Sequence, residues 1–251
     1  TFFTDELTAI YPKTEIDTFF FLLIEAKLDL QRIDTVLKPD FLINEEVLSE
    51  LKSIINRLQK EEPIQYILGE TEFYGLPFKV TENTLIPRPE TEELVEWVLR
   101  EAAELQSDKN AELKILDIGT GTGCIPISIA KNTNKTTVSA IDVSSEALKI
   151  AKQNAILNKV DVSFLEMDIL AAKELPQQYN IIVSNPPYVR ELEKVEIKNN
   201  VLENEPHLAL FVADDNPLIF YSKIADLAKK HLTENGVLFF EINQGYKTYY
   251  F

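Results

Sequence analysis

The chain has 251 residues, 45% of them hydrophobic, and a formal net charge of −16, which suit one large globular domain or a main domain with a smaller appendage. The acidic balance argues against a nucleic-acid substrate held by a basic face, because nonspecific affinity for nucleic acids comes from lysine and arginine neutralising phosphates. One cysteine, two well-separated histidines and the absence of a long apolar run argue against a disulfide framework, a zinc site and a membrane span.

Residues 1–68 carry helical patterns and no strand pattern. Thr14-Glu15-Ile16-Asp17 resembles a capping box and predicts the start of a helix. Lys38-Pro39-Asp40 breaks the pattern, and a second helix is predicted after Asn44, where apolar residues recur at three- and four-residue spacings. We expect a small all-helical N-terminal domain here, which as a unit could recognise a substrate or partner.

Residues 69–88 change character and predict a β-hairpin linker. Two β-rich runs flank Gly75 and Pro77, which are residues typical of a turn. Pro89 then suits the first turn of a helix, and the glutamates that follow complement the positive end of its dipole. We expect this helix to open a second domain over 89–251.

From residue 113 onward, strand and helix patterns alternate, which predicts an α/β fold with a parallel sheet covered by helices on both faces. The expected strands are 113–118, 138–141, 162–167, 179–184 and 237–242. The expected helices between them start at 125 and span 145–158 and 217–232.

A glycine-rich loop follows the first strand of this alternation. It contains Asp117, Gly119, Thr120, Gly121, Thr122 and Gly123. Glycine lets the backbone approach a ligand closely, and open parallel sheets bind nucleotides at such loops. Asp117 would repel a pyrophosphate but could hold an ammonium group. The loop therefore favours S-adenosyl-L-methionine, which is cationic and lacks phosphate, over NAD; a tight turn without a ligand is the alternative.

Two acids end the next two strands. Asp142 could accept hydrogen bonds from both ribose hydroxyls of the cofactor, or serve as an N-cap for the following helix. Asp168 could accept a hydrogen bond from the adenine amino group while Ile169 packs near the ring. The alternative for Asp168 is a solvated acid at the end of a strand.

The fourth strand ends in Asn185-Pro186-Pro187-Tyr188. The two prolines forbid continuation of strand or helix, so they hold the backbone at Asn185 rigidly. The Asn185 carboxamide offers one acceptor oxygen and two donor hydrogens. Alone, an Asn-Pro-Pro run is better explained by a Pro-rich surface turn. After a predicted cofactor loop in the same sheet, it indicates the edge of an active site.

These motifs together resemble class I S-adenosylmethionine-dependent methyltransferases with a Rossmann-like fold. The stretches upstream, Glu72-Phe73-Tyr74-Gly75 and Ile86 to Glu92, and the small helical domain resemble the PrmC/HemK family in particular, and Glu205-Pro206, Ala209-Leu210 and Glu241-Ile242 agree with that pattern. The resemblance spans nearly the whole chain. It implies N5-methylation of the glutamine in the Gly-Gly-Gln loop of class-1 peptide chain release factors, with S-adenosyl-L-homocysteine as the product.

The resemblance also carries expectations for the site and the partners. Asn185, Pro186 and Tyr188 are expected to be catalytic, and with Pro187 they would bind the substrate glutamine, while Asn185 would also touch the cofactor. Arg88 could brace a junction by pairing with an acid, or contact the substrate protein. We expect a cytoplasmic monomer without metal, membrane or direct nucleic-acid partners. The family normally continues past 237–242 with a further helix and two closing strands, and this chain is expected to lack these strands.

Two other functions remain open. The Asn-Pro-Pro-Tyr seat could instead hold a flipped base, as in an adenine or guanine N-methyltransferase that acts on nucleic acid. A non-catalytic binding module with a vestigial fold is the third reading. The acidic charge and the upstream motifs disfavour the first, and the intact glycine loop together with Asn185 disfavours the second.

Overall fold

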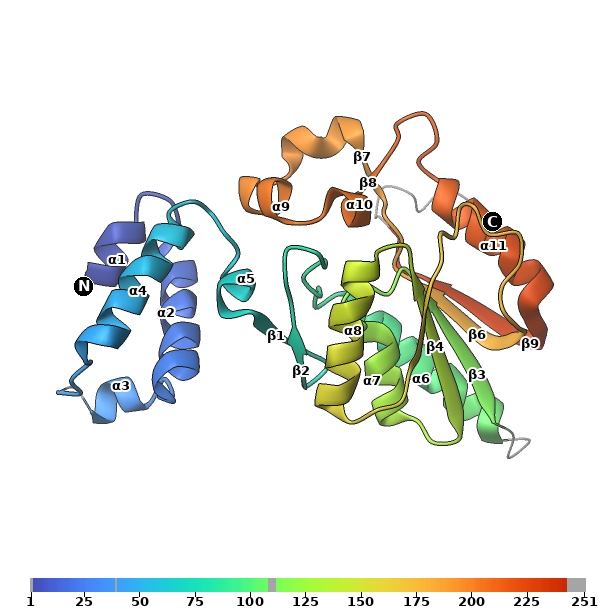
Figure 1. Cartoon of the computed structure of the whole chain (residues 1–251), viewed down its shortest axis with the longest axis horizontal. Helices are drawn as coiled ribbons and strands as arrows, with labels where there is room; N and C mark the ends of the chain where they lie inside the picture. Colours follow the sequence, from blue (N-terminus) through green and yellow to red (C-terminus); the bar gives the residue numbers. More distant parts are fainter. Residues whose placement is uncertain (1, 39, 108–111, 243–251) are drawn as a thin grey trace. The chain divides into compact units, whose positions relative to one another are not determined.

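The computed structural model describes residues 2–38, 40–107 and 112–242, and the chain forms two compact units (Figure 1). The first unit covers the chain up to Gly69 together with Asn199–Asn204, and the second covers the remainder from Glu70. Within the described ranges, no helix is both long and apolar enough to cross a membrane.

The first unit is helical, as predicted. Its helices are α1 (Phe2–Leu7), α2 (Lys13–Leu28), α3 (Asp34–Leu37), α4 (Glu45–Leu58) and α5 (Ile64–Leu68), and α9 (Asn199–Asn204) groups with them. The predicted start after Asn44 is confirmed, because the Asn44 side chain accepts a hydrogen bond from Val47 N at 2.8 Å and so caps α4. Apolar residues of α1, α2, α4 and α5 form a core of their own.

The capping box predicted at Thr14 is wrong. Helix α2 begins at Lys13, two residues earlier than a Thr14 cap would give, and its N-cap is Pro12, which makes no side-chain capping bond. The Pro12 carbonyl instead accepts hydrogen bonds from Glu15 N and Ile16 N. Pro12 stays outside the helix in an extended conformation, and its ring fixes φ at −66°. The predicted break includes Pro39, which lies outside the described residues.

The second unit is built on a five-stranded parallel sheet, which confirms the predicted α/β class. Its strand order is β5-β4-β3-β6-β9. The strands are β3 (Leu113–Ile118), β4 (Thr136–Asp142), β5 (Ser163–Glu166), β6 (Tyr179–Ser184) and β9 (Leu232–Phe240). The strand predicted to run to Ile242 therefore ends two residues earlier, and residues 243–251 lie outside the described range.

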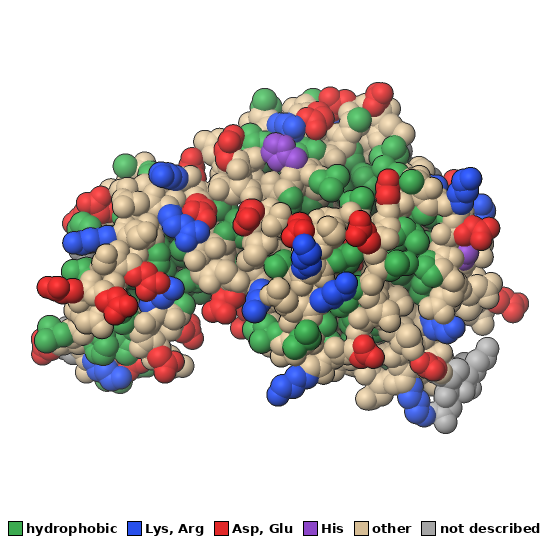
Figure 2. All heavy atoms as spheres, viewed as in Figure 1, with side chains coloured by type: hydrophobic (Ala, Val, Ile, Leu, Met, Phe, Trp, Pro, Cys, Tyr) green, Lys and Arg blue, Asp and Glu red, His purple; other side chains and the backbone are tan. Residues whose placement is uncertain are grey.

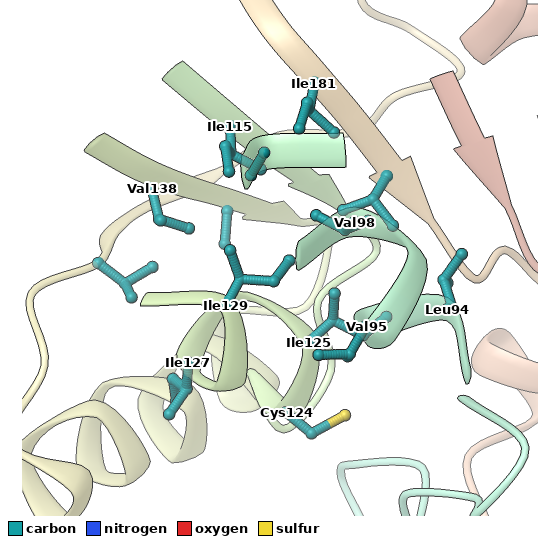
Figure 3. Close-up of a cluster of buried hydrophobic side chains, with 14 of the residues drawn as sticks. Leu94, Val95, Val98, Ile115, Cys124, Ile125, Ile127, Ile129, Val138 and Ile181 are labelled. Carbon is teal, nitrogen blue, oxygen red and sulfur yellow. The ribbon is translucent and has the colours of Figure 1, made fainter. Parts of the chain in front are cut away.

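Helices cover both faces of this sheet. They are α6 (Thr91–Ser107), α7 (Cys124–Asn132), α8 (Ser145–Asn158) and α11 (Ile219–His231). Consecutive strand residues belong to opposite cores, because side chains alternate across a strand: Ile181 packs in the cluster with α6 and α7, and Ile182 in the cluster with α11. Figure 3 shows the first cluster, where Val98 and Ile129 approach Ile115 from two helices.

The predicted hairpin is confirmed as β1 (Glu70–Phe73) and β2 (Leu76–Lys79), paired antiparallel. Both residues of its two-residue turn, Tyr74 and Gly75, have positive φ, which is the geometry that tight hairpins favour. The Asn154 side chain of α8 then bonds both backbone groups of Lys79, which fastens the hairpin to the rest of the second unit.

Five short elements follow β6 and were not predicted. They are β7 (Val189–Arg190), the 3₁₀ helix η1 (Glu191–Glu196), α9, α10 (His207–Leu210) and β8 (Phe211–Val212). Strands β7 and β8 pair in parallel over two residues each. Elements this short are too brief to show a hydrophobic periodicity, so they cannot be predicted from the sequence pattern.

Candidate active site

The carboxyl ends of β3, β4 and β6 meet at one edge of the sheet. Ile118 pairs with Ile141 on one side and Ser184 on the other. The buried Ser184 hydroxyl donates to the Ile118 carbonyl at 2.7 Å, which holds the ends of β3 and β6 together. A cavity of about 240 Å³ opens here, in the position where parallel sheets bind ligands.

The glycine-rich loop forms part of the cavity wall. Gly119 N and Thr120 N both donate to the Ile141 carbonyl, so the loop folds back over the end of β4. Gly119 and Gly121 have positive φ, line the cavity, and would carry a Cβ into open space. Gly123 does not line it; a Cβ there would lie 2.9 Å from Ile127 Cδ1, so this glycine serves helix packing.

Asp142 lines the cavity at the end of β4. Its Oδ2 accepts from Gly121 N at 2.8 Å and its Oδ1 from Ser144 N at 2.9 Å. The N-cap of α8 is Ser144, whose hydroxyl accepts from Ala147 N, so the alternative that Asp142 is the N-cap is wrong. Each Asp142 oxygen keeps lone-pair capacity for a further donor, and burial raises the pKa of the carboxyl.

Asp117 lies beneath the loop on β3 and is fully buried. Among the described residues, neither of its carboxylate oxygens has a hydrogen-bond partner, and the same holds for the Thr120 hydroxyl. Burial raises the pKa of Asp117 to about 7; the nearby Thr120 hydroxyl opposes this rise, and the charge of Asp142 adds to it. An unpartnered buried carboxylate is costly, and the raised pKa of Asp117 relieves this cost by favouring the protonated form. Asp117 itself is not among the residues that line the cavity.

Asp168 and Ile169 also line the cavity. Asp168 is exposed, and its Oδ1 accepts from Leu170 N at 2.9 Å, which shapes the turn after β5. Ile169 is buried and packs in the core on the α11 side of the sheet. The two predicted residues therefore lie together at the end of the third strand of the alternation.

Asn185, Pro186 and Pro187 line the cavity directly after β6, the strand next to β3 in the sheet. Tyr188 is half-buried and is not among the cavity-lining residues. Burial raises the pKa of Tyr188, and Glu241 and Glu90 add to the rise while Arg88 opposes it. The structure thus brings the glycine-rich loop and the Asn-Pro-Pro turn to one cavity.

Several residues of the site were not predicted. Thr91 lines the cavity at the start of α6, and Phe220 and Ile224 line it from α11. Glu241 follows β9 and bonds Thr91. Thr91 and Glu241 both fall in stretches quoted for the family resemblance, but no local pattern assigns them to a cavity. Cys124 also lines the cavity, and burial raises its pKa to about 12, so it remains a thiol.

Comparison with known proteins agrees with this geometry. Residues 3–69 match the family model described as PrmC N-terminal domain, and residues 102–210 match Methyltransferase small domain. A release factor glutamine methyltransferase from Flavobacterium psychrophilum is 56% identical over 242 residues, which are 96% of this chain and 84% of that protein. The chain belongs to the PrmC/HemK family. A Bacteroides thetaiotaomicron protein of the same name is 45% identical over 96% of this chain and 84% of its own length.

Arg88 shows how this PrmC/HemK chain shapes the mouth of its cavity. Its Nη2 lies 2.6 Å from Glu205 Oε1, and Glu205 Oε2 accepts from Ile86 N at 3.2 Å. Of the two possibilities raised for Arg88, the structure shows the pairing with an acid. Arg88 and Pro206 both line the cavity. The ion pair therefore links two segments of the cavity wall, the one before α6 and the one that contains Glu205 and Pro206.

Proposed function

We propose that this protein transfers a methyl group from S-adenosyl-L-methionine to the side-chain N5 of the glutamine in the Gly-Gly-Gln loop of class-1 peptide chain release factors. The observation that carries the proposal is that the Asn185-Pro186-Pro187 turn and the glycine-rich loop line one cavity. The names of the family relatives support the choice of release factor over other planar-nitrogen substrates.

The residues that would hold the cofactor fit its chemistry. The orphaned Asp117 carboxylate would accept from the ammonium group, and Thr120 would add a second polar contact. Asp142 would accept from the ribose hydroxyls, and Asp168 with Ile169 would face the adenine. When bound, S-adenosyl-L-methionine supplies an electrophilic methyl group on a cationic sulfur.

The role of the Asn-Pro-Pro turn follows from the chemistry of a carboxamide. A carboxamide nitrogen is a weak nucleophile because its lone pair is delocalised into the carbonyl. Asn185 Oδ1 and the Pro186 carbonyl would accept its two hydrogens, which orients the nitrogen and favours electron density on it. Pro187 stiffens the turn, and Tyr188 would border the planar group from its half-buried position.

We also assign substrate recognition to the helical first unit. It exposes several large apolar residues close together in sequence, namely Ile33, Val36, Leu37, Phe41 and Leu42, with Leu42 90% exposed. Clustered exposed apolar side chains are typical of protein-interaction surfaces. Leu42→Asp should raise KM for intact release factor at least about threefold. Ile156→Asp, at an exposed position of α8, is the matched control and should leave KM unchanged; equal effects would contradict the assignment.

The overall activity is tested by incubating the protein with S-adenosyl-L-methionine and release factor, tRNA, rRNA or duplex DNA in parallel. We expect methyl transfer to release factor alone. Transfer to nucleic acid would favour the base-methylating alternative, and a failure to bind the cofactor would favour a non-catalytic module. Figure 2 shows acidic and basic side chains interspersed on the visible face, in keeping with a protein substrate.

A further inference from the structure

The side chain of Asn185 is held by a short hydrogen-bonded chain. Asn185 Nδ2 donates to Thr91 Oγ1 at 3.4 Å, and Thr91 Oγ1 lies 2.7 Å from Glu241 Oε2. An ionised carboxylate only accepts, so the single hydroxyl hydrogen of Thr91 points to Glu241. The lone pairs of Thr91 then remain for an N–H donor, which selects the amino end of the Asn185 amide.

The two supporting residues are themselves fixed. Glu241 N donates to the Ser184 carbonyl at 3.1 Å, which extends the β6–β9 pairing by one residue, and the Tyr221 hydroxyl donates to the Glu241 carbonyl at 3.1 Å. Thr91 is 2% exposed at the start of α6. Neither residue can shift without disturbing the sheet or the helix end, so the hydrogen-bonded chain has a defined geometry.

The electrostatic surroundings of Glu241 agree with this arrangement. Burial raises the pKa of its carboxyl, while hydrogen bonds from Thr91 and then from Asn185 hold it down; Glu90 raises it further, and Arg88 lowers it. The Asn185 nitrogen therefore donates to Thr91 Oγ1 close to the negative charge of Glu241. Asn185 Oδ1 accepts no hydrogen bond from any of the described residues.

We propose that Thr91 and Glu241 are positioning residues that set the rotation of the Asn185 carboxamide, so that Oδ1 and not Nδ2 is presented to the substrate amide. A carboxamide can turn by half a rotation and exchange its two ends at little steric cost. The exchanged form would offer a donor to the donor hydrogens of the substrate and could not orient them. The negative charge of Glu241 also polarises the Asn185 amide, which makes Oδ1 a better acceptor.

This inference rests on the proposed function, and its test separates the two. Glu241→Gln keeps size but can donate to Thr91, whose hydroxyl then becomes free to donate to Asn185 Oδ1. Thr91→Val removes the hydroxyl at constant shape, and Thr91→Ser retains it as the conservative control. We expect Glu241→Gln and Thr91→Val each to lower kcat about ten- to a hundredfold. Calorimetry should show cofactor affinity changed by less than about threefold, and KM for release factor should be similarly unaffected.

The conservative and double variants make the result decisive. Thr91→Ser should keep kcat within about threefold of the native protein. The double variant Thr91→Val with Glu241→Gln should be no slower than the worse single variant, because both substitutions interrupt the same series of hydrogen bonds. A native kcat in Glu241→Gln would overturn the proposal, as would equal losses in Thr91→Ser and Thr91→Val. Losses that track the melting temperature or cofactor affinity would also overturn it. Inactivity of the native protein on release factor would instead refute the proposed function.

Discussion

The Arg88 guanidinium lies 2.6 Å from the Glu205 carboxylate, across 117 residues of sequence. The Glu205 side chain is 1% exposed and that of Arg88 is 32% exposed. The acid is therefore the buried partner, and it also accepts from Ile86 N. This one carboxylate joins the segment before α6 to the loop after β6.

The two partners should differ in their importance for stability. Arg88→Met leaves a buried carboxylate without its counter-charge and should lower the free energy of unfolding by about 3–5 kcal/mol. Glu205→Gln should cost less than about 2 kcal/mol, because its amide oxygen still accepts from Ile86 N and water can reach Arg88. Urea unfolding measures both. An equal or reversed order would contradict the view that Glu205 is the buried member.

Substitutions of Asn185 and Asp142 should affect turnover and cofactor binding differently. Asn185→Ala removes the acceptor for the substrate amide and should reduce turnover at least about a hundredfold, with cofactor affinity within a few fold. Asp142→Ala should do the reverse and weaken cofactor binding first, since it also frees Gly121 N and Ser144 N. Calorimetry with S-adenosyl-L-homocysteine and single-turnover assays measure the pair. Unchanged affinity in Asp142→Ala would remove that residue from the cofactor site.

The pKa of Asp117 predicts a pH dependence. Its folded value of about 7 is above the ordinary 3.8, so the folded protein holds this proton more tightly than the unfolded chain does. The resulting stability is fully present below 3.8 and is lost as pH rises through about 7. Asp117→Asn should lack this loss, so the native protein should weaken relative to the variant between about pH 5 and 8.

Cofactor binding should couple to the same proton. An ammonium group favours the ionised carboxylate, so binding should release a proton near neutral pH and affinity should rise as Asp117 ionises. Calorimetry in two buffers of different ionisation enthalpy detects this release. Asp117→Asn should abolish it. Equal proton release in both proteins would show that another group is responsible.

Alanine substitutions at two glycines of the loop should differ in their effects on stability and on cofactor affinity. Gly123→Ala meets Ile127 and Ala151 at a positive φ and should cost about 2–4 kcal/mol of unfolding free energy. Gly121→Ala has no heavy atom within 4 Å and should cost about 1–2 kcal/mol, from its positive φ alone. Its methyl group enters the cavity, so it should weaken cofactor binding more than Gly123→Ala does. Urea unfolding and calorimetry distinguish them, and the opposite ranking of affinities would contradict this division.

Local patterns predicted the main elements of the second unit. The strands β3 and β6 are apolar runs of ordinary length, and the hairpin turn at Tyr74-Gly75 has residues that suit it. Because parallel strands end at one edge, the sequence pattern also places Asp142 and Asn185 near each other. These inferences need only short stretches of sequence and the geometry of a parallel sheet.

Contacts between distant segments could not be predicted in this way. Glu205 meets Arg88, and Glu241 meets Thr91, only after the sheet and its loops have formed. Nothing in the residues adjacent to Glu241 distinguishes a support for Asn185 from a solvated acid at a strand end. The prediction of the start of α2 was wrong for a local reason. Pro12 and Thr14 are both residues that commonly precede a helix, and the structure has Pro12 as the N-cap.

The proposed reaction is tested most directly by mass spectrometry of release factor after incubation with the protein and S-adenosyl-L-methionine. We expect the mass of one added methyl group on the glutamine of the Gly-Gly-Gln loop, present with the native protein and absent with Asn185→Ala. An unmodified glutamine under conditions where the protein binds the cofactor, or a methyl group on another residue or on nucleic acid, would contradict it.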